Sequence, residues 1–186
     1  MKIIELKLRG PMALLEEDAE RAFLFAQEDA WRSGIYLWSF LYNQADRVNA
    51  VGVANDGVVP AHAVQVASFL RGEHVLHAAG DRAEGRLRRV YEPGEGPAAL
   101  TANGADLCAE LNGLRIFFAP VDEGAAVQAR IAAALTRHYQ RLGGKAMEWF
   151  QPGRAGEAPA GESGEAMMVR FYRPVLMVNM PDELMI

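Results

Sequence analysis

The stretch "SGIYLWSFLYNQADRVNAVGVA", Ser33 to Ala54, decides the fold. From Ile35 to Tyr42 the residues at both alternating positions are apolar, so we expect a strand buried on both faces, inside a covered sheet. The residues "NQAD" that follow have the polarity and length of a hairpin turn. Val48 to Ala54 then returns as the second strand. This stretch therefore predicts a β-hairpin at the centre of the protein.

Two elements are predicted before the hairpin. Residues 3–8, "IIELKL", alternate between apolar and charged positions, which indicates a half-buried strand that Pro11 ends. Residues 12–31, "MALLEEDAERAFLFAQEDAW", place apolar residues near one helical face and acidic residues on the other. This pattern predicts a helix that leads into the hairpin.

After the hairpin, helices and strands are mixed. The helices are predicted from Pro60 to the Gly72 cap, over Ala105–Leu111, and from an Asp122 cap to Leu142. The strands are predicted in "RLRRVYEP", "RIFFAP" and "MMVRFYRPVLMVNM", the last one broken or confined to an edge by Pro174. We therefore expect an α+β fold with a small, mostly antiparallel sheet flanked by helices.

The chain is expected to form one domain in four parts. Residues 1–32 are an N-terminal strand and helix extension, and residues 33–150 are the main body. Residues 151–166, rich in Gly, Pro, Ala and Glu, are predicted to be a mobile loop. Residues 167–186 supply a C-terminal strand that completes the domain.

Composition limits the function classes. The 186 residues are 51% hydrophobic and 23% charged, as in soluble globular proteins. Neither a signal peptide nor a membrane-spanning run is expected. The lone Cys108 cannot form an intramolecular disulfide, which favours a reducing, cytoplasmic location. The net charge of -5 lowers the expectation for nucleic-acid binding.

A series of short motifs occurs in order along the chain. "GIY" opens the hairpin and "AVG" closes it; "FLRGEH", "RLRRVYEP", "RIFFAP" and "ARIAAAL" follow. Together, over residues 33–150, this series resembles the GIY-YIG endonuclease superfamily. The resemblance implies a nuclease-like antiparallel sheet flanked by helices. The motif framework that matches is Gly34, Ile35, Tyr36, Val51 and Gly52.

The resemblance also implies chemistry. Members of that family hydrolyse DNA phosphodiesters with one divalent metal, using two motif tyrosines, an arginine, a histidine or tyrosine, and a metal-binding glutamate. Such a reaction needs positive charge and a metal around the phosphate. In this chain Tyr36 matches the first tyrosine, whereas the other chemical positions fall on Ala50, Ala61, Gln65 and Ala132.

These losses favour a catalytically inactive nuclease-like domain with a binding, regulatory or structural role. Its expected partner is a protein, with weak DNA binding or none, no membrane partner and no cofactor; self-association into a homo-oligomer is compatible with the sequence. One alternative is a divergent endonuclease using Mg²⁺ or Mn²⁺, with His62 and Arg130 as substitutes for lost groups. Another is a non-cleaving nucleic-acid-binding module that uses Arg86 and Arg88 for phosphate contacts.

A metal site is a weaker interpretation of "EHVLH", which places Glu73, His74 and His77 close together in sequence. The spacing matches no zincin motif, and no second cluster of ligands is evident. We therefore expect no metal site in this segment.

Overall fold

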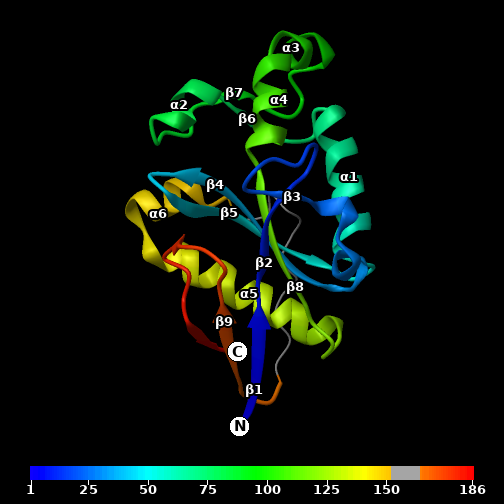
Figure 1. The fold of residues 1–186 in the computed structure, drawn as a ribbon. Coiled ribbons are helices and arrows are strands. Elements are labelled where there is room, and N and C mark those ends of the chain that lie inside the picture. The colour runs from blue at the N-terminus through cyan, green and yellow to red at the C-terminus, as the bar shows by residue number, and fades with distance from the viewer. Residues whose placement is uncertain (152–163) are drawn as a thin grey trace.

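The computed structural model describes residues 1–151 and 164–186, apart from the side chains of residues 145–147, and has an α+β architecture (Figure 1). Within these described residues, the central sheet has six strands. In spatial order they are β10 (Met177–Val178), β5 (Ala45–Ala54), β4 (Gly34–Tyr42), β8 (Arg115–Pro120), β2 (Arg9–Ala13) and β3 (Ala22–Phe23). The long pairs β5–β4, β4–β8 and β8–β2 are antiparallel, whereas the short pairs β10–β5 and β2–β3 are parallel. The sheet is thus mixed and larger than predicted.

The predicted hairpin is confirmed as β4 and β5, and its first seven residues in β4 are all buried. Since side chains alternate across a strand, β4 contributes to two cores. Ile35 and Leu37 face α5 (Ala125–Leu142), on which Ile131 and Leu135 are buried. Residues Tyr36, Trp38 and Phe40 face the other way, toward α1 (Val58–Leu70) and its buried residues Val58, Val59 and Phe69. The central sheet therefore separates an α5 core from an α1 core.

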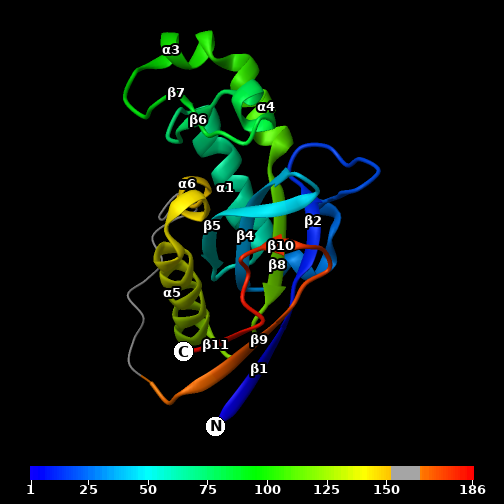
Figure 2. The same cartoon turned by 90° about the vertical axis from the view of Figure 1, so that its left-hand side faces the viewer.

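A second sheet joins the two ends of the chain. Its strands are β1 (Lys2–Lys7), β9 (Met167–Tyr172) and β11 (Glu183–Met185), with β1 parallel and β11 antiparallel to β9. Both termini lie at this end of the molecule (Figure 2). The predicted C-terminal strand is present as β9, which pairs with the N-terminal strand β1, and the segment is broken around Pro174, between β9 and β10, as predicted.

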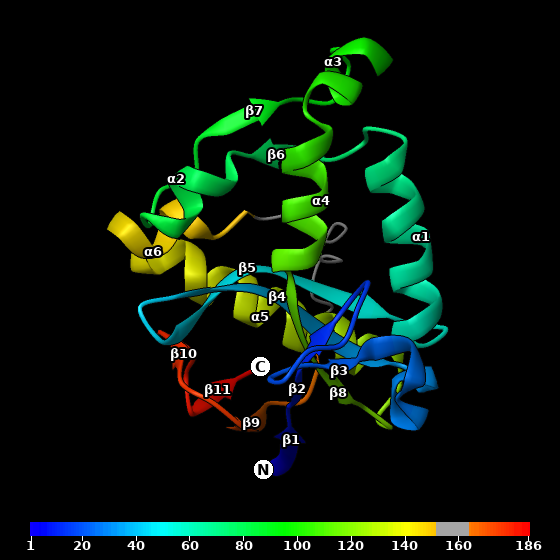
Figure 3. The same cartoon turned by 45° about the horizontal axis from the view of Figure 1, so that its top comes forward.

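Short elements form a lobe at the opposite end of the central sheet (Figure 3). They are β6 (Leu76–His77), α2 (Ala79–Ala83), β7 (Arg89–Tyr91), α3 (Pro97–Ala102) and α4 (Gly104–Gly113), and β6 pairs with β7. α6 (Gly144–Trp149) follows α5. The α4 helix leads directly into β8, so this lobe is continuous with the central strands.

The predicted helix over residues 12–31 is wrong. The segment forms the end of β2, an exposed loop, β3 and two 3₁₀ turns, Leu24–Ala26 and Glu28–Trp31. Met12 pairs with Ile116 of β8, and the Asp18 carboxylate accepts the backbone N–H groups of Glu20 and Arg21. Long-range strand pairing and a local side-chain turn thus replace the helical hydrogen bonds.

Two other boundaries differ from expectation, and a third prediction lies mostly outside the described residues. Pro11 lies within β2, where the register with β8 shifts between Arg9 and Met12, so it does not end the strand. α5 begins at Ala125 after Gly124, and Asp122 does not cap it. The mobile loop predicted over 151–166 falls mostly on residues 152–163, outside the described residues.

Two glycines of the motif framework have a packing role. A Cβ at Gly52 would overlap the ring of Tyr36, its cross-strand partner on β4. A Cβ at Gly34 would overlap the carbonyl group of Ala119 on β8. The hairpin and β8 therefore approach as closely as they do because these two positions have no side chain.

We predict that Gly52→Ala lowers the free energy of unfolding by about 1–3 kcal/mol, because the added methyl group overpacks the Tyr36 ring. Urea denaturation measures this change. Gly80→Ala is the matched control, since nothing lies within 4 Å of a Cβ added there, and it should not destabilise. When Tyr36→Ala is already present, Gly52→Ala should lower the free energy of unfolding by clearly less. An equal loss of unfolding free energy with and without Tyr36→Ala would contradict the proposed contact.

Candidate functional site

Tyr36, the motif tyrosine, lies inside the α1 core with 1% of its surface exposed. Its ring contacts the edge of His62, with 4.5 Å between the ring centroids. Burial raises the pKa of the Tyr36 phenol well above its usual value. The phenol therefore stays protonated and inaccessible to a solvent-borne substrate.

His62 is close to Tyr36, as a substitute catalytic group would need to be, but it is fully buried. Its Nε2 accepts the indole N–H of Trp38 at 2.9 Å, so its Nδ1–H donates to the carbonyl oxygen of Val58 at 2.8 Å. Burial lowers the pKa of His62 to about 4. Both ring nitrogens are thus occupied, and the ring is neutral at physiological pH.

The remaining positions from the resemblance do not form one site. Ala50 faces the α1 core opposite Trp38, and Ala61 packs at the edge of that core. The side-chain oxygen of Gln65 contacts His74 Nε2 at 3.0 Å. Ala132, however, is buried in the α5 core on the other side of the sheet.

The substitute Arg130 also belongs to α5, and its Nη2 donates to the carbonyl oxygen of Glu165 at 2.9 Å. It is therefore engaged with the segment before β9 and not with Tyr36.

Arg86 and Arg88, the predicted phosphate contacts, are exposed but already paired. Both guanidinium groups donate to Asp81 of α2, each at 2.7 Å, and Arg86 also pairs with Glu84 at 2.6 Å. The local positive charge is thus largely neutralised.

The residues of "EHVLH" point into three environments. Glu73 accepts from Arg71, His74 stacks on Phe69, and the buried His77 contacts Glu110. Within the described part of the chain, no three His, Cys, Asp or Glu side chains come together as a metal site would require. Nor does any helix there have the length and apolarity to cross a membrane.

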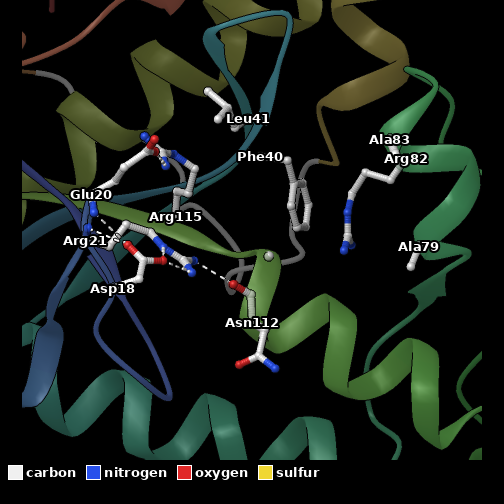
Figure 4. A pocket seen from close by; sticks show the side chains of 11 residues that line it. Asp18, Glu20, Arg21, Phe40, Leu41, Ala79, Arg82, Ala83, Asn112 and Arg115 are labelled. Atoms are coloured by element: carbon white, nitrogen blue, oxygen red, sulfur yellow. Dashed lines mark hydrogen bonds and ion pairs between the residues drawn. The ribbon is translucent and has the colours of Figure 1, made fainter.

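An open pocket lies where the end of the hairpin meets the lobe and the loop around residues 18–21 (Figure 4). We call it the arginine pocket; its volume is about 380 Å³, within the range of small-molecule sites. Its walls include Asp18, Glu20, Arg21, Phe40, Arg82 and Arg115.

Each guanidinium group of the arginine pocket is held by the protein. Arg21 donates to Asp18 at 2.8 Å and to the carbonyl oxygen of Asn112 at 2.6 Å. Arg82 donates to the buried Glu110 at 2.5 Å and lies 4.5 Å from the centre of the Phe40 ring. These pairs fix the orientation of the Arg21 and Arg82 side chains in the walls of the pocket.

The third guanidinium group belongs to Arg115, the first residue of β8, whose side chain is 9% exposed. Its Nε donates to Asp46 Oδ1 at 2.7 Å and its Nη2 to Asp46 Oδ2 at 3.3 Å. Ser39 Oγ on β4 also donates to Asp46, at 2.7 Å. Three neighbouring strands, β5, β4 and β8, are thus tied together beside the pocket.

Sequence reasoning missed the arginine pocket. The available signal was the position of two charged residues: Asp46 in the predicted hairpin turn, and Arg115 as the first residue of the predicted strand "RIFFAP". A charge at such a position requires a partner. The pairing itself connects residues 69 positions apart and was not predictable from local spacing.

Comparisons with protein-family models, with curated proteins and with solved structures each gave no match. The similarity to GIY-YIG nucleases therefore stays a hypothesis based on the residues of this chain.

Proposed function

We propose that this chain is a non-catalytic binding domain on a GIY-YIG-nuclease-like scaffold, and that its ligand occupies the arginine pocket. The observation that carries the proposal is the 1% exposure of Tyr36, set against an open pocket elsewhere. A substrate phosphate cannot reach the Tyr36 phenol without opening the α1 core. Catalysis at the motif tyrosine is therefore disfavoured, whereas binding at the arginine pocket needs no such opening.

The nuclease-like part of the proposal is supported by the order of elements. The hairpin β4–β5, helix α1, strand β8 and helix α5 follow one another in the order expected from the resemblance, and β4 lies between β5 and β8 in an antiparallel arrangement. Tyr36 and Ala132 belong to cores on opposite sides of the central sheet, so a nuclease site that joins these two positions cannot form in this fold.

The binding role is supported by the shape and chemistry of the pocket. Pockets that hold small molecules combine an apolar surface with a few fixed polar groups. Here Leu41, which is 46% exposed, supplies the apolar surface, and guanidinium groups held by Asp46 and Glu110 supply the fixed polar groups. The pairing of Arg86 and Arg88 with acidic neighbours disfavours nucleic acid as the ligand.

The neutral state of His62 gives a further argument against catalysis at Tyr36. A general base at neutral pH has a pKa near 7 and a free ring nitrogen. His62 has a lowered pKa and donates or accepts at both nitrogens within the core. Its role in this proposal is packing and hydrogen bonding.

We predict that His62 makes stability depend on pH between about 6.5 and 4. The unfolded ring has a pKa of about 6.5, and the folded ring one of about 4. The stabilisation by neutral His62 is then complete above pH 6.5 and is lost as the pH falls toward 4, by roughly 3 kcal/mol.

Urea unfolding at a series of pH values, with wild type and His62→Gln, measures this effect. Glutamine can accept from Trp38 and donate to Val58, yet it does not titrate. The difference in unfolding free energy between the two proteins should therefore change across this pH range. A constant difference would contradict the assignment of a buried, neutral His62.

We predict that the protein does not nick supercoiled plasmid in Mg²⁺ or Mn²⁺, because Tyr36 is inaccessible and the resembled arginine and metal-ligand positions are Ala61 and Ala132. Agarose gel electrophoresis measures nicking, with protein-free plasmid as the baseline. Metal-dependent nicking by wild type that Tyr36→Phe abolishes would restore the endonuclease alternative.

A further inference from the structure

The Arg115 guanidinium group uses its two edges differently. The edge formed by Nε and Nη2 donates to Asp46, whose side chain is only 2% exposed. Nη1 instead lies 3.3 Å from Oε2 of Glu20, on the wall of the arginine pocket (Figure 4). Asp46 is therefore a permanent partner inside the fold, whereas Glu20 is a partner within the pocket.

The Glu20 side chain is weakly held. It is 68% exposed, and its pair with Arg115 is a single contact. Exposed ion pairs of this kind contribute little stability, because water solvates both charges and the long side chain loses freedom in the pair. An external anion can thus replace the Glu20 carboxylate at small cost.

The loop that carries Glu20 does not depend on this contact. Asp18 accepts the backbone N–H groups of Glu20 and Arg21, and Arg21 ties the loop to the carbonyl oxygens of Asn112 and Leu114. The Arg21 side chain, followed by the Glu20 backbone N–H, holds the pKa of Asp18 at about 2, so Asp18 stays ionised. The Glu20 side chain can therefore move aside while the wall of the pocket stays in place.

The balance of charge indicates which anion fits. The three arginines face four carboxylates: Asp18 and Glu20 on the wall, and Asp46 and Glu110 behind it. When Glu20 moves out, three carboxylates remain for three arginines. A ligand with one negative charge restores the original balance, whereas a phosphate group, with a charge of about -1.5 to -2 at pH 7, exceeds it.

Resting on the proposed binding function, we infer that the arginine pocket binds a small monocarboxylate, whose oxygen replaces that of Glu20 at Arg115 Nη1. Glu20 then acts as an internal competitor for the ligand. The pocket, with a volume of about 380 Å³, accommodates the rest of the molecule beside the exposed Leu41.

The test titrates the protein with benzoate, with benzamide as the neutral match and with inorganic phosphate, and follows the backbone amides by ¹H–¹⁵N NMR. Wild type, Glu20→Gln and Glu17→Gln are compared. Both substitutions remove one negative charge from the same exposed loop, but of these two glutamates only Glu20 has a described contact with Arg115. Arg115 itself is left unchanged, because its loss would leave Asp46 buried without its cationic partner.

Benzoate is expected to shift the amides of Glu20, Asn112, Gly113 and Arg115. Its Kd should fall about three- to tenfold in Glu20→Gln, since the competing carboxylate is gone, and stay unchanged in Glu17→Gln. Benzamide should bind far more weakly than benzoate, and phosphate should bind more weakly as well.

The inference would be overturned if the two substitutions had equal effects on the Kd of benzoate, or if phosphate bound more tightly than benzoate. Pocket shifts of equal size with benzamide would also overturn it, but would leave a binding pocket in place. Absence of shifts at the pocket with all three compounds would overturn both the inference and the proposed binding role of this pocket.

Discussion

The burial of β4 on both faces is the constraint on which the rest of the structure depends. A strand without a solvent face needs a covering layer on each side, and α1 and α5 supply these layers. Close packing within the sheet then requires small residues where backbone and rings approach, which accounts for Gly34 beside β8 and Gly52 beneath the Tyr36 ring. The same constraint assigns successive residues of β4 to different cores.

This alternation affects how a motif in the hairpin is interpreted. Catalytic groups must converge on one accessible point, so they have to share a face and reach solvent. Tyr36 and Ala50 share a face, but that face is covered by α1, and Ala132 lies beyond the opposite face. Packing alone explains why glycine and tyrosine occur at Gly52 and Tyr36, so the motif by itself is no measure of activity.

The elements that were predicted correctly are those with a long, local pattern of apolar residues in the sequence. The hairpin and β8 each have a continuous run of apolar residues, α5 has apolar residues at helical spacing, and all three are present. Residues 12–31 also had a helical period, but Met12 pairs with Ile116 of β8, about one hundred positions away, and Asp18 closes a local turn.

The arginine pocket could not be predicted from local sequence patterns, because it too depends on contacts between distant residues. Its pairs join Arg82 to Glu110 and Asp46 to Arg115, across 28 and 69 positions, and a sequence period carries no information on such pairing. The sequence did indicate a basic cluster around Arg86 and Arg88. These two side chains are exposed and paired with the carboxylate of Asp81.

Arg115 links the stability of the fold to the chemistry of the pocket. A guanidinium group has five N–H donors in one plane, so one edge can satisfy a buried carboxylate while another N–H faces outward. Because Asp46, to which Ser39 donates, holds the inner edge, the entropy of fixing the Arg115 side chain is lost during folding and not again on binding. The outward donor is thus preorganised, whereas its present partner Glu20 is largely exposed. The rigid Arg115 donor can therefore exchange the mobile Glu20 carboxylate for an external one. This difference in mobility between donor and acceptor, more than the number of arginines, makes the pocket suited to an anionic ligand.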